Sequence, residues 1–177
     1  WISGYTGPPE KFHQKVLDVV AGKNTVAALA SLHEREPLRP EPLIKLGIKY
    51  QERQNRPKAL ELFQQAAALD PGGKIKMRRE NGEIVSCREM ADYQYARTHV
   101  VTFGLIEHRR VADFIKKYPA SPLVRDAYLD MMVVYYTDAD GTSVYDPMEA
   151  AFPHDLQIAN RLARQARSYS QYNQKGK

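Results

Sequence analysis

The sequence predicts an all-α fold, a stack of antiparallel helical hairpins, on three observations. Apolar residues recur at helical spacing in several segments of the 177-residue chain. Small residues stand at Gly47 and Ala59, one in each of two consecutive predicted helices. Proline, glycine and capping residues divide the chain into helix-sized segments. We expect one interruption of the helical pattern, an inserted β-hairpin at about residues 74–85.

Composition and charge limit the classes of protein to consider. Hydrophobic residues make up 43% and charged residues 27%, and no apolar run approaches the roughly 20 residues of a membrane-spanning helix. The net charge is +5, but the basic residues are interleaved with 21 acidic ones, which favours a solvated surface over a nucleic-acid or lipid-binding one. The single cysteine, Cys87, excludes a disulfide within the chain.

Residues 1–21 open with a short strand-like run and a glycine–tyrosine turn, followed by a helix that starts near Pro9. The apolar positions of that helix are Phe12, Val16, Val19 and Val20. This order resembles the C-terminal end of a thioredoxin-like domain. The Cys-x-x-Cys motif of that family is not in this chain, so the resemblance assigns no redox residue here. Because the chain begins with Trp1 rather than Met, we expect it to be part of a longer polypeptide.

Three helices are predicted next. The first spans about residues 24–34, with Asn24 or Thr25 as its N-cap. The second spans about residues 42–53, after a stiff link with three prolines: Pro37, Pro40 and Pro42. Asn55 caps the third, which has a proline just inside its first turn and ends at an Asp-Pro-Gly-Gly sequence.

A spacing motif extends across the second and third of these helices. Its residues are Leu43, Leu46, Gly47, Tyr50, Ala59, Phe63, Ala66 and Pro71. We expect Gly47 and Ala59 to let the two helix backbones approach, while Phe63 and Tyr50 fill the space around the contact. The motif resembles that of the tetratricopeptide repeat (TPR) family, with Leu43 where Trp is commonest. The resemblance implies a TPR-like stack that acts in protein–protein interaction.

In the TPR family, the first helix of a repeat lines a concave groove. The corresponding positions form a possible partner-binding groove: Glu41, Ile44, Ile48, Gln51 and Glu52. Chaperone-binding members grip a terminal carboxylate at such places, but Ile44 and Ile48 do not support that clamp here. Either the helix at 24–34 covers the groove, or the groove takes an apolar peptide. We favour coverage, because a single repeat cannot bury its own face.

Residues 74–85 break the helical pattern. Asn81 and Gly82 lie between short alternating segments, which predicts the β-hairpin; an irregular basic loop is the alternative. Ser86 and Glu89 then form a capping box for a helix that ends near Gly104. Its inward residues are Met90, Tyr93, Ala96, Val100 and Val101.

Two further helices are predicted at about residues 107–118 and 122–136. Their apolar residues are Val111, Phe114, Ile115, Leu123, Ala127, Tyr128, Met131, Val134 and Tyr135. The Tyr-Pro-x-Ser-Pro sequence between them resembles a TPR variant common in bacterial envelope scaffold proteins, without the small residues of the strict signature. A short helix follows from Asp146, and a last one runs from Pro153 to about Tyr169.

The sequence predicts no catalytic, cofactor or metal site. Asp138 and Asp140 precede a glycine as in a calcium loop, but Tyr136 and Pro147 stand at the first and last ligand positions, which favours a plain polar turn. The five histidines lack metal-site spacing. Cys87 follows an N-cap, where the helix dipole would favour the thiolate, but without an evident partner we interpret it as an incidental thiol.

The predicted organisation is the end of a thioredoxin-like domain at residues 1–21, a TPR-like domain at 22–170 and a flexible tail at 171–177. We expect a non-enzymatic protein–protein interaction scaffold, C-terminal to a thioredoxin-like domain in a larger bacterial protein. Two alternatives stay open: an accessory part of a thiol–disulfide oxidoreductase whose Cys-x-x-Cys lies upstream, and a module that binds nucleic acid through the basic segment 74–79. Many proteins that share the resemblance and this layout are exported, which favours a location in the cell envelope. The partner's identity and the oligomeric state stay open.

Overall fold

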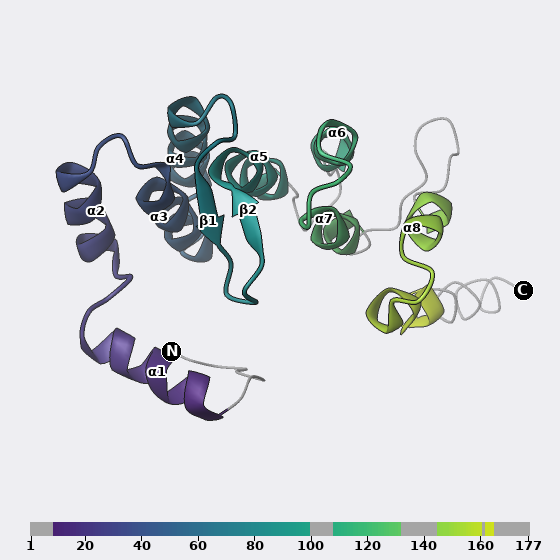
Figure 1. The fold of residues 1–177 in the computed structure, drawn as a ribbon, viewed down its shortest axis with the longest axis horizontal. Helices are drawn as coiled ribbons and strands as arrows, with labels where there is room; N and C mark the ends of the chain where they lie inside the picture. The colour runs from purple at the N-terminus through teal and green to yellow at the C-terminus, as the bar shows by residue number, and fades with distance from the viewer. Residues whose placement is uncertain (1–8, 100–107, 132–144, 161, 165–177) are drawn as a thin grey trace, which may run out of the picture. The chain divides into compact units, whose positions relative to one another are not determined.

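The structure is a computed structural model that describes residues 9–99, 108–131, 145–160 and 162–164 (Figure 1). The chain divides into two compact units, Trp1–Thr98 and His99–Lys177, which are described separately here. The described part is predominantly helical and contains one small antiparallel sheet. The prediction of a helical fold with one inserted β-hairpin is therefore confirmed at this level.

The first unit consists of five helices and one hairpin among the described residues. The helices are α1 (Pro9–Val20), α2 (Val26–Arg35), α3 (Pro40–Glu52), α4 (Arg56–Leu69) and α5 (Cys87–Thr98). The strands β1 (Lys76–Arg78) and β2 (Ile84–Ser86) lie between α4 and α5 in the sequence. The helix α3 contacts α2, α4 and α5, and α4 also contacts α5, so α3, α4 and α5 lie side by side (Figure 1).

Short-range capping explains where several helices begin. The side-chain oxygens of Thr25, Asn55 and Ser86 each accept a hydrogen bond from the backbone N–H three residues on, at 3.2, 3.3 and 3.1 Å. These bonds satisfy N–H groups that have no partner within the first turn of a helix. Thr25 rather than Asn24 is the cap of α2, because Asn24 adopts a left-handed backbone with φ 59°.

The helix α3 begins at Pro40, two residues earlier than predicted. Two of the three prolines expected in the link, Pro40 and Pro42, therefore lie in the first turn of this helix. Proline is tolerated there because its missing N–H would have no helical partner. Both prolines are buried, so they contribute to the core as well as to the helix start.

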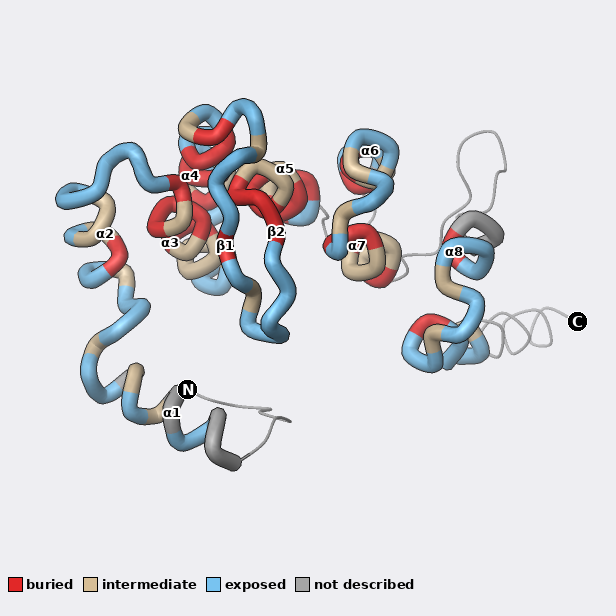
Figure 2. Tube along the Cα trace, in the orientation of Figure 1, coloured by how far each residue is buried: buried red, intermediate tan, exposed pale blue. Residues whose placement is uncertain are grey.

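The contact between α3 and α4 is centred on Gly47 and Phe63. An added Cβ at Gly47 would lie only 2.4 Å from the Phe63 ring, a distance that real Cβ atoms do not show. Phe63, Ala59 and Ala66 are completely buried. The absence of a side chain at Gly47 thus lets the aromatic ring pack directly on the backbone of α3. Within the first unit, Figure 2 shows the buried residues concentrated on α3, α4, α5 and parts of the hairpin.

The hairpin packs one face inward and exposes the other. Met77 pairs with Val85 across the two strands, and both are buried. The neighbouring pair, Arg78 and Ile84, is exposed, as the period of two in a strand requires. Gly82 in the predicted turn has φ 91°, a conformation that favours glycine.

The second unit contains α6 (His108–Lys117), α7 (Val124–Met131), α8 (Tyr145–Ala151) and helical residues at 156–160 and 162–164. The predicted start of α7 at Pro122 is wrong by two residues. Turn bonds at the backbone precede the helix: the N–H of Ser121 donates to the carbonyl of Tyr118, and that of Val124 to the carbonyl of Ser121, both at 3.0 Å.

The last helix begins at Leu156, not at the predicted Pro153. Asp155 is its cap, since one carboxylate oxygen accepts from the backbone N–H of Gln157 at 2.9 Å and of Ile158 at 3.1 Å. A local capping residue therefore overrides the helix-start tendency of the proline two positions earlier.

The core of the second unit includes Leu129, Met148 and Ile158, each at most 8% exposed. The rings of Tyr128 and Phe152 meet edge to face beside them, with centroids 6.1 Å apart. Several predictions lie outside the described residues: the strand before α1, the inward residues Val100 and Val101, the helix end near Gly104, the residues Val134 and Tyr135, the loop around Asp138 and Asp140, the end of the last helix near Tyr169, and the tail at 171–177.

Candidate functional site

The predicted groove residues all lie on α3 but differ in accessibility. Ile44 is completely buried, whereas Ile48 and Gln51 are half-buried and Glu52 is exposed. Both α2 and α5 pack against α3. A ligand approaching this face would therefore meet Ile48, Gln51 and Glu52, but not the side chain of Ile44.

The fifth groove residue, Glu41, is committed to contacts within the chain. Its carboxylate binds Lys45 at 2.7 Å and Arg39 at 2.9 Å, and Arg39 also binds Glu36 at 2.8 Å. Burial opposes ionisation of Glu41, but the hydrogen bonds from Lys45 and Arg39 outweigh it and lower the pKa of Glu41. The hydrogen bonds that the Arg39 guanidinium donates to Glu36 and Glu41 raise the pKa of Arg39. This cluster balances its own charges.

Asp70 holds the base of the hairpin, a role that the sequence reasoning missed. Its side chain is buried, and its carboxylate oxygens accept from the backbone N–H groups of Lys74 at 2.8 Å, Ile75 at 3.3 Å and Arg88 at 3.3 Å. The Asp-Pro-Gly-Gly sequence indicated a helix end, but nothing near it in the sequence pointed to a partner 18 residues away.

Two further bonds complete the junction between α4, the hairpin and α5. The backbone N–H of Cys87 donates to the carbonyl of Ile75 at 2.8 Å. The Arg88 guanidinium donates to the carbonyl of Ala67 at 3.0 Å and to the carboxylate of Asp92 at 3.0 Å. Residues 70, 75, 87 and 88 thus fix the hairpin to both helices, and we call this set the hairpin junction.

Cys87 lies inside the hairpin junction and is completely buried. Burial, followed by the nearby carboxylate of Asp70, raises the pKa of the Cys87 thiol to about 11. Burial thus outweighs the effect of the helix N-terminus that the sequence suggested, and the thiol is consistent with the incidental one that we expected. At neutral pH this side chain is a neutral thiol packed in the core, and it offers no accessible nucleophile.

A shallow apolar depression lies on the surface beside the hairpin junction. It is lined by Glu36, Pro37, Leu38, Arg39 and Ile75. Leu38 is 79% exposed and Ile75 is 39% exposed, so two large aliphatic side chains face solvent in one depression. The depression is therefore formed by two segments that are distant in the sequence, the link before α3 and the residue that precedes β1.

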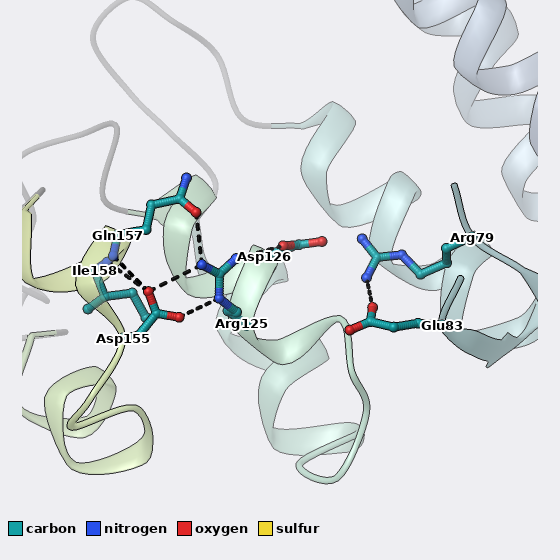
Figure 3. A network of polar contacts seen from close by, with 7 residues as sticks. All are labelled: Arg79, Glu83, Arg125, Asp126, Asp155, Gln157 and Ile158. Carbon is teal, nitrogen blue, oxygen red and sulfur yellow. Dashed lines mark hydrogen bonds and ion pairs between the residues drawn. The ribbon is translucent and has the colours of Figure 1, made fainter. Parts of the chain in front are cut away.

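The strand next to this depression is basic. Lys74, Lys76 and Arg78 are exposed, and none has an ion-pair partner within the described ranges. The next residue, Arg79, differs, because it pairs with Glu83 across the turn (Figure 3). Three cations are thus available to a ligand on one short segment.

The second unit contains a separate polar network around Arg125 (Figure 3). The guanidinium donates to Asp155, with one bond of 3.2 Å, and to the side-chain oxygen of Gln157 at 2.8 Å. The bond from Arg125 lowers the pKa of Asp155, against a smaller opposing effect of burial. These contacts tie α7 to the start of the last helix and have a structural role.

In the part of the chain that the structure describes, no group of three or more His, Cys, Asp or Glu residues could hold a metal ion. Within the same ranges, no helix combines the length and the apolarity needed to cross a bilayer.

Comparisons with protein-family models, with curated proteins and with solved structures found no match to this chain.

Proposed function

We propose that this chain is a protein-binding module of the helical-repeat class, with a TPR-like stack in its first unit. The main support is the arrangement of α3, α4 and α5. The pair α3 and α4 packs closely at Gly47, and α5 continues the stack by contacting both helices. Stacked helices of this kind expose extended faces that suit the binding of other polypeptides.

Two places in this unit are suited to a partner. One is the open end of the predicted groove, at Ile48, Gln51 and Glu52. The other is the depression at Leu38 and Ile75, next to the exposed cations of residues 74–78 in the sequence. The first lies on α3, and the second lies on the link before α3 and on the residue before β1, where backbone hydrogen bonds to Leu32 and Glu36 and from Cys87 to Ile75 hold the chain in place for binding.

A second candidate function is nucleic-acid binding, which the exposed cations Lys74, Lys76 and Arg78 favour. The affinity for a single-stranded oligonucleotide, measured at increasing salt concentrations, tests this second function. Binding that is driven by phosphate contacts should weaken steeply as the salt concentration rises. For the alternative of an accessory part of an oxidoreductase, this chain supplies no accessible redox residue, since its only cysteine is the buried Cys87.

Selection from a displayed peptide library on the immobilised chain tests the proposed function. We expect enriched peptides that bind the natural chain and the control variant Gly72→Ala. They should not bind Gly47→Leu, in which the bulk of the new side chain separates α3 from α4. No enriched peptide, or equal binding to Gly47→Leu, would contradict the proposal.

A further inference from the structure

We infer that the surface beside the hairpin binds an acidic peptide segment that carries a large apolar residue. We call this surface the hairpin platform and define it by Leu38, Ile75, Lys74, Lys76 and Arg78. The inference deepens the proposed protein-binding function and rests on it, since it names the surface and the chemistry of the partner.

The apolar part of the platform is preformed. Leu38 and Ile75 come from segments far apart in the sequence, yet both line the same depression. Their exposure leaves aliphatic surface in water that a partner side chain could cover, with a gain of about 25 cal/mol per Å² of buried apolar area. A leucine or phenylalanine side chain matches this depression in chemistry.

The backbone beneath the platform is held on both sides of Ile75. Its N–H donates to Asp70, and its carbonyl accepts from the N–H of Cys87 at 2.8 Å. On the other side of the depression, Arg39 is fixed by Glu36 and Glu41. A surface fixed in this way loses little conformational entropy on binding, which favours affinity.

Charge selects the partner. Around the depression, Glu36, Arg39, Glu41 and Lys45 compensate one another. The cations Lys74, Lys76 and Arg78, at and just before β1, have no such partners within the described ranges, so the segment that flanks Ile75 carries uncompensated positive charge. Aspartate and glutamate beside the apolar anchor would supply the missing charges.

A peptide explains both halves of the platform better than a nucleic acid does. A phosphate backbone would engage the cations, as the salt-dependent mode of nucleic-acid binding requires. It would leave the exposed aliphatic side chains of Leu38 and Ile75 uncovered. We therefore assign the platform to an acidic peptide with an apolar anchor.

Fluorescence anisotropy on the full chain tests this assignment. The probe is a fluorescein-labelled dodecapeptide with a central Leu-Phe pair flanked by aspartates and glutamates. We expect saturable binding that weakens about tenfold in Lys74→Glu/Lys76→Glu and about fivefold in Leu38→Ser. A probe with serines in place of Leu-Phe should bind at least about fivefold more weakly.

A matched control changes the same residue types outside the platform. Lys116 and Leu156 are exposed residues of the second unit, and Leu156 is 79% exposed, like Leu38. The double variant Lys116→Glu/Leu156→Ser should bind the probe as the natural chain does. Circular dichroism of every variant checks the fold, which these surface changes should leave intact.

Three outcomes would overturn the assignment. In the first, an oligo-dT strand or phosphatidylserine vesicles bind more tightly than the peptide, and Leu38→Ser has no effect. In the second, the probe does not bind, although library selection still yields ligands that depend on Gly47; the proposed function then stands without the platform. In the third, neither the probe nor any library peptide binds, and both proposals fail.

Discussion

At the scale of single residues, Gly47 shows how packing outweighs helix propensity. Glycine within a helix costs about 1 kcal/mol relative to alanine. The position nevertheless tolerates no side chain, because an added Cβ would lie 2.4 Å from the Phe63 ring. Packing of that ring on the backbone of α3 compensates for the poor propensity.

We predict that Gly47→Ala destabilises the chain by about 1–2 kcal/mol, although the same substitution in an unpacked helix stabilises it. Thermal melting by circular dichroism measures the effect. Gly72→Ala is the control, since its new Cβ would meet only the Lys74 side chain at 3.7 Å, and it should change stability by less than about 0.5 kcal/mol. A raised melting temperature in Gly47→Ala would refute the close contact; adding Phe63→Leu should recover part of the loss.

Cys87 gives a second prediction, on pH. Its folded-state pKa of about 11 lies above the unfolded value of 9.0, so the folded state favours the neutral thiol. This contribution is complete below pH 9 and is lost as pH rises from about 9 to 11. Compared with Cys87→Ala, the natural chain should lose on the order of 2 kcal/mol of unfolding free energy over that range.

Urea unfolding of both chains between pH 8 and pH 11 measures that difference, because other titrations are shared and cancel. Parallel curves for the two chains would contradict the buried thiol. In the native state at pH 8, Cys87 should also react with a thiol reagent far more slowly than in urea, since it is completely buried.

Residue-level prediction from sequence succeeded where a side chain acts on its near neighbours. The caps at Thr25, Asn55 and Ser86 and the turn at Gly82 depend on bonds or backbone angles within a few residues. The role of Asp70 could not be predicted from the sequence, because the hairpin brings one of its partners, the backbone N–H of Arg88, close to it only in the folded chain. The burial of Cys87 and its proximity to Asp70 likewise arise only in the folded chain, so the sequence could not show that its pKa is raised.

At the scale of elements, Asp70 connects three of them. Its carboxylate accepts backbone N–H groups of Lys74, Ile75 and Arg88, which leaves the hairpin base and the start of α5 attached to the end of α4. Without this acceptor, three partly buried N–H groups would lose their partner, each at a part of the cost of about 1–3 kcal/mol that applies to a fully buried group.

We therefore predict that Asp70→Ala lowers the free energy of unfolding by about 2–3 kcal/mol. Hydrogen exchange should quicken first at the amides of Lys74, Ile75 and Arg88. Asp113→Ala is the control, because Asp113 is an exposed acid on α6 and should change stability by less than about 0.5 kcal/mol. Equal stability of the two variants would show that the junction contributes nothing.

The link from α7 to the last helix predicts an acid dependence. Because Arg125 lowers the pKa of Asp155, the ionised carboxylate stabilises the folded state above the unfolded pKa of 3.8, and this contribution is lost as pH falls through the folded pKa. Arg125→Met should reduce this acid sensitivity, with the backbone bonds from Gln157 and Ile158 keeping part of it, while Lys116→Met should leave it unchanged. The loss of helical signal in circular dichroism as pH falls measures the acid sensitivity of each variant. Identical curves for Arg125→Met and the natural chain would contradict a stabilising contact between Arg125 and Asp155.

Element boundaries were harder to predict than element types. The helices and the hairpin were anticipated from periodicity and turn residues, but α3 starts at Pro40 and the last helix at Leu156. Proline both ends links and begins helices, so sequence alone does not decide which side of it a helix occupies. The bonds that decide it belong to Asp155 and to the packing around Pro40.

At the scale of the whole molecule, the sequence anticipated a binding module but not the surface that we propose for it. The groove on α3 followed from the TPR resemblance, and Ile44, its central apolar residue, is buried in this structure. The hairpin platform joins residues 38 and 75, and only the folded chain brings them to one depression. Its function requires the packed first unit, since the backbone of Ile75 is held by α4 and α5.

Amide NMR titration of the full chain with the acidic Leu-Phe dodecapeptide tests most directly whether the hairpin platform binds an acidic peptide, because it locates the bound peptide without a substitution. We predict shifts concentrated at Leu38, Arg39 and residues 74–78, with few elsewhere. Shifts confined to Ile48, Gln51 and Glu52 would place the partner in the groove instead and contradict the platform; no shifts at saturating peptide would contradict acidic-peptide binding altogether.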